Sequence, residues 1–208
     1  MKKYSKEKIV KLTTEAMLMA IIIIMSFTPL GYLKTGVIEI TFIMVPVVVG
    51  SIICGSAAGA FLGLVFGITS FVQCFGMSPF GAALLEINPV LTFIVCIVPR
   101  VLAGLIPGLV YSAITKKNTV RQAVGTPVSS LLAPLLNTAL FTSLLIICFG
   151  NTDYIQSIRA GKNVLAFAAA FVGVQGLIEA AVCFAVSTAV CAAVNASMKR
   201  RTKSGKAV

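Results

Sequence analysis

Residues 46–71 read PVVVGSIICGSAAGAFLGLVFGITSF, an apolar run without a single charged side chain. Glycine recurs at every fourth position from Gly55 to Gly67. This spacing lines one face of a helix with hydrogen atoms, so that a second helix backbone can approach closely. Arg100, Gly104 and Gly108 repeat the spacing further along the chain. We therefore expect helices that pack closely inside a bundle, with a sliding face for conformational change as the alternative.

The whole chain is almost as apolar as this run. Of its 208 residues, 58% are hydrophobic and only 11% are charged, and the mean hydropathy is +1.02. Lipid tails solvate so much apolar surface, whereas a soluble domain of this size has no use for it. The length suffices for about six spans of ~20 residues each. Little chain is left for a soluble catalytic domain.

These features predict an all-α integral membrane protein, with residues 1–208 forming a single six-helix membrane domain. The expected helices cover residues 8–28, 41–54, 57–75, 89–115, 123–149 and 164–198. A tight turn joins the second helix to the third. The other connections are loops over 29–40, 76–88 and 150–163 and a short basic segment before 123, and 76–88 has room for one helical turn.

Several prolines lie inside the predicted helices. Pro89 suits a first helical turn, where no amide hydrogen is needed. Prolines further inside a helix remove a hydrogen bond, so they free carbonyl groups that must find other partners at membrane depth. Four prolines are expected to kink the helices over 89–115 and 123–149: Pro99, Pro107, Pro127 and Pro134.

The positive charge is placed at the ends of the apolar spans. Lysine and arginine cluster in residues 2–11, 116–121 and 199–206, and the net charge is +11. Basic residues next to membrane spans remain on the cytoplasmic side, so both termini are predicted to be cytoplasmic and the three longer loops outside. The clusters are expected to contact anionic lipid headgroups rather than nucleic acid. A ligand should enter from outside.

The sequence contains no motif for a cofactor or for catalysis. The chain has six scattered cysteines, no Cys-x-x-Cys pair and no histidine, so the cysteines are interpreted as small buried apolar residues without a metal or disulfide role. No Walker A sequence, no zinc motif and no Gly-x-Ser-x-Gly is present. We predict no catalytic residue, no metal ligand and no cofactor. Uphill transport would need energy from another subunit or an ion gradient.

Polar side chains at membrane depth are costly, and they are functional candidates for that reason. Arg100 lies eleven residues after Pro89, ~16 Å below the outer end of its helix at 1.5 Å per residue. Asn137 lies ~21 Å from the inner end of its helix by the same rise. The full set of candidate ligand-binding residues is Gln73, Asn88, Arg100, Asn137, Gln175 and Glu179.

Two interpretations of these residues remain open. In the first, Arg100 and Glu179 form a buried ion pair between helices, and Asn137 satisfies the backbone of a kinked helix. In the second, the guanidinium of Arg100 binds an anionic solute, because its planar fork matches a carboxylate. The neighbouring amides would then bind hydroxyl or amide groups of the same solute.

Together these features resemble the substrate-binding S components of energy-coupling factor (ECF) transporters. Six helices, cytoplasmic ends, the run over 46–71 and the motif Ala16-Met-Leu-Met-Ala20 all fit. The resemblance implies that Ala16 and Ala20 contact a transmembrane coupling subunit, and that outer loops and the last three helices enclose a vitamin. It also implies two ATPase subunits, the plasma membrane of a prokaryote, and no enzymatic activity in this chain.

Residues 87–89 (INP) and 98–104 (VPRVLAG) resemble the pantothenate-specific members of the family. Pantothenate has a carboxylate, an amide and two hydroxyl groups, which suits Arg100 beside Asn137 and Gln73. Riboflavin or another B vitamin is the alternative, although a flavin favours aromatic stacking and the chain has no Trp and four Tyr. An intramembrane enzyme or a structural or channel protein is the alternative from another class. Co-purification with a coupling subunit and two ATPases would distinguish them.

Overall fold

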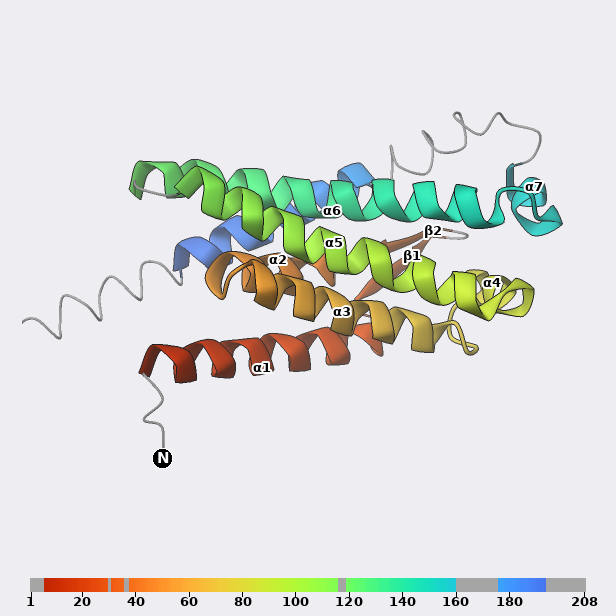
Figure 1. Cartoon of the computed structure of the whole chain (residues 1–208), viewed down its shortest axis with the longest axis horizontal. Helices are drawn as coiled ribbons and strands as arrows, with labels where there is room; N and C mark the ends of the chain where they lie inside the picture. The colour runs from red at the N-terminus through yellow and green to blue at the C-terminus, as the bar shows by residue number, and fades with distance from the viewer. Residues whose placement is uncertain (1–5, 30, 36–37, 116–118, 160–175, 194–208) are drawn as a thin grey trace, which may run out of the picture.

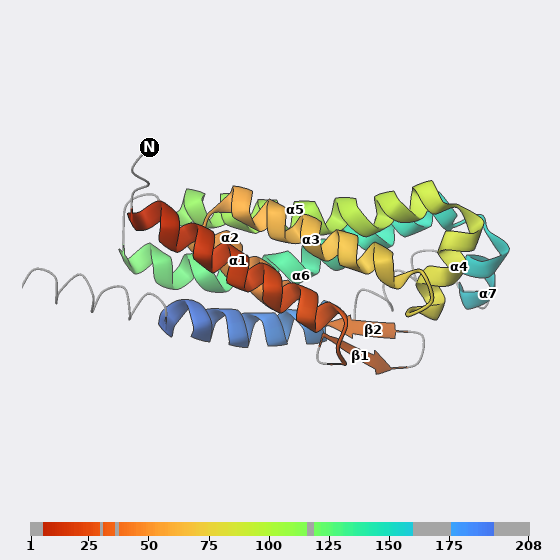
Figure 2. The ribbon, with the colours of Figure 1, turned by 90° about the horizontal axis from the view of Figure 1, so that it is seen from below.

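The computed structural model describes residues 6–29, 31–35, 38–115, 119–159 and 176–193. Five helices in this part are long and apolar enough to cross a membrane. Their bounds are α1 (Lys6–Ser26), α3 (Ser56–Gln73), α5 (Pro89–Thr115), α6 (Thr119–Phe149) and the unlabelled helical segment Gly176–Ala193. They form an elongated bundle, in which the start of α1 and the end of Gly176–Ala193 lie at the same end (Figures 1 and 2).

Most of the predicted spans agree with these helices to within a few residues. The bounds of α5 are those predicted, and those of α1, α3 and α6 differ from the prediction by one to four residues at one end or both. Of the predicted last helix, residues 176–193 are helical and the remainder lies outside the described residues. The prediction of six spans is met in part, because the second apolar segment is short.

The second helix, α2 (Met44–Ile53), has ten residues. At 1.5 Å per residue it is ~15 Å long, about half the thickness of the hydrocarbon core of a bilayer. The predicted tight turn to α3 is confirmed, and Gly55 at this turn has a φ of 107°, which glycine adopts without steric cost.

A β-hairpin replaces the loop that we predicted before α2. Strand β1 (Tyr32–Thr35) pairs antiparallel with β2 (Ile38–Thr41), and Tyr32 lies opposite Thr41. The β-branched residues of β2 favour an extended strand, which explains why the helix predicted from residue 41 begins only at Met44. The fold is therefore a helical bundle with one short hairpin in its described part, and not strictly all-α.

Two short helices lie together at the end of the bundle opposite the start of α1 (Figure 1). They are α4 (Pro79–Ile87) and α7 (Asp153–Arg159), in segments that we predicted as loops. The prediction for 76–88 is wrong because α4 has nine residues rather than one turn. Ser78 caps α4 by accepting a hydrogen bond from the Gly81 amide at 3.3 Å, and Pro79 occupies its first turn.

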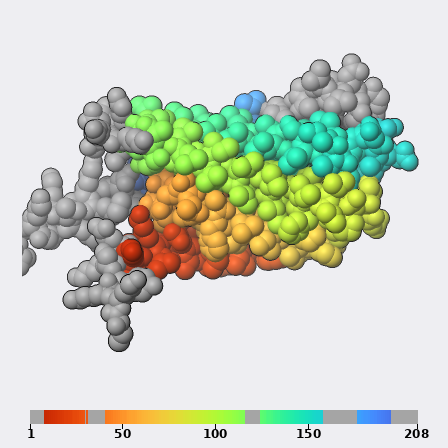
Figure 3. Space-filling model, viewed as in Figure 1, coloured from red at the N-terminus to blue at the C-terminus, as the bar shows by residue number. Residues whose placement is uncertain are grey.

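The glycine faces of α3 and α5 pack directly against each other, as the spacing predicted. A β-carbon added at Gly59 would overlap the carbonyl oxygen of Gly104, and one added at Gly63 would overlap that of Arg100. At Gly67 the added carbon would lie 3.0 Å from the Ile97 α-carbon. Figure 3 shows the atoms of the two helices meeting along the visible face. This close approach fixes the height of Arg100 relative to α3.

Candidate functional site

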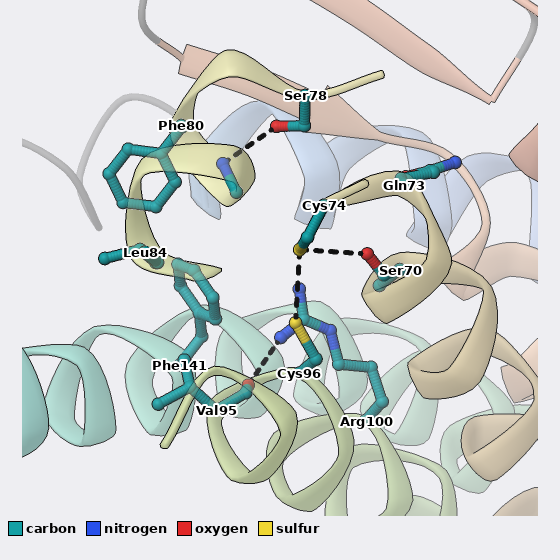
Figure 4. A pocket seen from close by; sticks show the side chains of 11 residues that line it. Ser70, Gln73, Cys74, Ser78, Phe80, Leu84, Val95, Cys96, Arg100 and Phe141 are labelled. Carbon is teal, nitrogen blue, oxygen red and sulfur yellow. Dashed lines mark hydrogen bonds between the residues drawn. The ribbon is translucent and has the colours of Figure 1, made fainter. Parts of the chain in front are cut away.

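A small cavity of about 80 Å³ lies between α3, α4, α5 and α6, near the end of the bundle covered by α4 (Figure 4). One strong cation, Arg100, and several hydroxyl, amide and thiol groups line it together with apolar side chains. The lining residues are Ser70, Gln73, Cys74, Ser78, Phe80, Gly81, Leu84, Val95, Cys96, Arg100 and Phe141.

The position of Arg100 follows from the proline before it. Pro99 has no amide hydrogen, so the carbonyl of Val95, four residues earlier, loses its helical donor. Arg100 supplies the missing bond, because its Nη1 donates to the Val95 oxygen at 2.8 Å. This bond turns the guanidinium back along α5 toward the cavity. The predicted free carbonyl and the predicted deep cation thus satisfy each other.

Two aromatic rings hold the guanidinium from other helices. Its central carbon lies 5.6 Å from the ring centre of Phe66 on α3 and 4.7 Å from that of Phe141 on α6. Cations at such distances are attracted by the ring faces, most strongly where water is absent. Arg100 is therefore held by α3, α5 and α6 at once, in a half-buried position.

Part of the hydrogen-bonding capacity of Arg100 is unused. Its Nε is buried and has no hydrogen-bond partner. A buried donor left without an acceptor costs about 1–3 kcal/mol. Because a guanidinium offers five N–H groups in a planar fork, an anionic group entering the cavity can be bound by two of them at once.

Gln73 lines the cavity, whereas Asn137 lies outside its lining. The Oδ1 of Asn137 is buried and has no hydrogen-bond partner, and Asn137 lies one helical turn from Phe141 on α6 rather than in the lining. Gln73 does line the cavity, but its Nε2 donates to the backbone oxygen of Ser26 and its side chain points away from Arg100 (Figure 4).

The structure does not bring Asn88 and Glu179 into the cavity lining. The Oδ1 of Asn88 accepts hydrogen bonds from the amides of Val90 and Leu91, each at 3.1 Å, and so caps the start of α5. The Glu179 carboxylate accepts from the Thr41 amide at 2.8 Å and from the Thr138 hydroxyl at 3.4 Å.

The ion pair that we considered between Arg100 and Glu179 is not formed between these two described residues. The hydrogen bond of Arg100 goes to Val95, whereas Glu179 joins the end of β2 to α6. Gln175, the remaining candidate, lies outside the described residues.

Sequence reasoning missed most of the neutral residues around Arg100. Cys96 lies one turn before Arg100 on α5, so helical periodicity could have placed it on the same face. Ser70 and Cys74 are likewise one turn apart and flank Gln73. Phe66 and Phe141 carried no sequence signal, because an apolar ring in a membrane helix does not reveal which helix it faces.

Comparison with known proteins defines the class. The family described as "ECF transporter, substrate-specific component" matches residues 10–191. Since this match covers most of the chain, the protein belongs to the family of substrate-specific components of ECF transporters, and it is a multi-pass membrane protein.

Two similar relatives narrow the comparison. The pantothenate transporter PanT of Leuconostoc mesenteroides is 31% identical over 151 residues, covering 70% of this chain and 71% of its own length. The pantothenic acid transporter PanT of Lactococcus lactis is 30% identical over 128 residues. That alignment covers 54% of this chain and 59% of the Lactococcus protein, so the chain spans less than two thirds of this relative.

Proposed function

We propose that this chain is the high-affinity substrate-binding subunit of an ECF-type ABC importer and that its substrate is pantothenate. The observation that carries the proposal is Arg100, a guanidinium inside the bundle with an unpartnered Nε and two flanking rings. The family match supports a transport role, and the names of the two relatives support the choice of vitamin.

The chemistry of pantothenate fits the groups around the cavity. Its carboxylate would accept from the Nε and a terminal nitrogen of Arg100, which is a strong, charge-assisted pairing. The buried Asn137 oxygen, which has no partner, would accept from a hydroxyl or amide of the ligand. The hydroxyl of Ser70 would bind the polar middle of the ligand, and so would Gln73 once its amide turned away from the Ser26 carbonyl.

Binding would require the cavity to expand. Its volume of about 80 Å³ is well below the ~300 Å³ at the lower end of ligand pockets. The element placed to move is α4, because it covers the cavity through Phe80, Gly81 and Leu84 and is one of the shortest helices described. The proposed substrate would therefore enter from the α4 end, which we assign to the outside of the plasma membrane of a prokaryote.

The remaining subunits of the importer follow from the same proposal. With the α4 end outside, the start of α1 and both termini would be cytoplasmic. Ala16 and Ala20 are exposed on α1, as the docking of a transmembrane coupling subunit would require. Two ATPase subunits would supply the energy for release of the vitamin inside, since the sequence has no Walker A motif.

Calorimetry with a panel of vitamins tests the proposal on the purified protein. Pantothenate should bind with one-to-one stoichiometry, and Arg100→Ala should weaken binding ~10- to 150-fold, because a charge-assisted hydrogen bond contributes about 1.5–3 kcal/mol. Val98→Ala on the same helix is the matched control, as Val98 is 39% exposed and lies outside the cavity lining. Binding of neutral vitamins alone, or of none, would remove the assignment of pantothenate.

A further inference from the structure

Two cysteine thiols face each other in the cavity wall. The sulfur atoms of Cys74 and Cys96 lie 3.9 Å apart, and the two side chains are only 4% and 6% exposed (Figure 4). Cys74 directly follows α3, and Cys96 lies on α5 one turn before Arg100. Neither sulfur belongs to a disulfide, and both side chains line the cavity. The proposed transport function assigns no role to this pair.

The surroundings of the pair permit a covalent bond. A disulfide needs a sulfur–sulfur distance of about 2.05 Å, so the two sulfurs must approach by roughly 2 Å. Helix α3, which Cys74 directly follows, is already in close contact with α5, because a β-carbon added at Gly67 would lie 3.0 Å from the Ile97 α-carbon. Rotation of two short side chains can therefore supply most of the movement, without displacing α3 from α5.

We propose that Cys74 and Cys96 form a covalent modification site, in which a peroxide oxidises the two thiols to a disulfide that holds the cavity closed. One thiolate attacks a peroxide oxygen and becomes a sulfenic acid, and the second peroxide oxygen leaves as water after taking up a proton. The other thiol then displaces the sulfenic hydroxyl, which also leaves as water. In total, two thiols and one hydrogen peroxide give one disulfide and two water molecules.

A small oxidant suits this site. The cavity of about 80 Å³ is larger than a single water molecule needs, and hydrogen peroxide is only slightly larger than water. A bulky disulfide reagent would have to displace α4 first. The cavity thus selects for peroxide over large oxidants.

The effect on the cavity follows from what surrounds Cys74. Its thiol donates to the Ser70 carbonyl at 3.4 Å, and a β-carbon added at Gly81 of α4 would lie 2.6 Å from its sulfur. Cys74 is therefore packed between the last turn of α3 and the first turns of α4. A bond from Cys74 to Cys96 would tie this junction to α5 beside Arg100. It would oppose the expansion that a vitamin requires.

The first test does not depend on the identity of the ligand. The purified full-length protein is treated with hydrogen peroxide, and its intact mass and its cysteine-containing peptides are measured before and after dithiothreitol. We expect a reversible loss of two hydrogen atoms and a peptide pair joined through Cys74 and Cys96. Cys74→Ser and Cys96→Ser should each abolish the cross-link. Cys183→Ser should keep it, because Cys183 lies in the segment Gly176–Ala193, where its thiol contacts Ser187 at 3.5 Å, and it does not line the cavity. Unchanged thiols, or a cross-link between other cysteines, would overturn the proposal.

The second test measures closure and rests on the proposed function. Pantothenate should bind the peroxide-treated protein at least about tenfold more weakly than the reduced protein, as expected if fewer than about one tenth of the molecules can open. Dithiothreitol should restore the affinity. A Cys74–Cys96 disulfide with unchanged affinity would overturn closure. Failure of the reduced protein to bind pantothenate would instead count against the proposed function, while the peptide map still decides the modification site.

Discussion

Pro99 and Arg100 illustrate how two costly residues become compatible in a membrane helix. The proline leaves the Val95 carbonyl without its helical donor, and the arginine next to it fills that place. The sequence predicted both a free carbonyl and a buried cation. It could not reveal that the arginine donates a hydrogen bond to that carbonyl, because this bond depends on the rotamer of Arg100 and on the rings of Phe66 and Phe141.

Arg100→Lys separates charge from shape at this position. Lysine keeps the positive charge but lacks the planar fork and stacks less well on aromatic rings. We expect Arg100→Lys to bind pantothenate about tenfold more weakly than the wild type, a loss of ~1.4 kcal/mol. It should still bind more tightly than Arg100→Ala. Titration calorimetry on the three proteins makes the comparison. Equal affinities for wild type and Arg100→Lys would show that charge alone suffices and that the proposed bidentate contact is absent.

Glu179 shows a second limit of sequence reasoning at the residue scale. Its depth was apparent from the sequence, but its partners come from β2, 138 positions away along the chain, and from α6. Glu179→Gln keeps an acceptor for the Thr41 amide, whereas Glu179→Leu removes it. A buried donor deprived of its acceptor costs about 1–3 kcal/mol, so the leucine variant should unfold at a lower temperature than the glutamine variant.

Thermal unfolding in detergent measures this difference, and pantothenate affinity provides an independent readout. Glu179→Gln should also fail to rescue Arg100→Ala, because the two side chains do not form an ion pair. Rescue would show that the two residues are electrostatically coupled. Equal unfolding temperatures for the glutamine and leucine variants would show that the Thr41 contact contributes little.

Among the elements, α3 and α5 form the closest pair, and glycine makes this possible. A larger side chain at Gly63 would meet the backbone of Arg100, with no flexible group that could yield. We expect Gly63→Leu to lower the unfolding temperature, since overpacking costs about 1–3 kcal/mol, and to weaken pantothenate binding by displacing Arg100. Ala57→Leu is the matched control, because Ala57 is exposed on the same helix and should tolerate the change.

The long elements were predictable and the short ones were not. Membrane spans are recognisable because the bilayer sets their length and composition. The hairpin and α4 have no such constraint, and their formation depends on what they pack against. A local signal for α4 was nevertheless present, since Ser78-Pro79 is a typical helix start. The cavity itself joins residues of four helices, and no sequence spacing reports that arrangement.

At the scale of the whole molecule, α1 lies at one edge of the bundle and is largely uncovered (Figure 1). An apolar groove of about 590 Å³ separates it from the segment Gly176–Ala193, with α2 at its base, and its lining includes Leu18, Val45 and Val186. The exposed face of α1 includes Ala16, Ala20 and the 63%-exposed Met17. Small residues on an uncovered helix allow a second helix to pack closely there.

The double change Ala16→Trp and Ala20→Trp tests whether this face receives the coupling subunit. Two bulky rings would fill the space between the helices and block association by steric overlap. The cavity lining includes no residue of α1, so pantothenate affinity of the purified variant should stay near that of the wild type, while uptake by cells should be abolished. Ile147→Trp is the control, because Ile147 is 78% exposed on α6 and should tolerate the same bulk with normal uptake.

Normal uptake by the double variant would place the docking face elsewhere. Loss of affinity would show that the rings disturb the bundle itself, since α1 also holds Gln73 through the Ser26 carbonyl at its end.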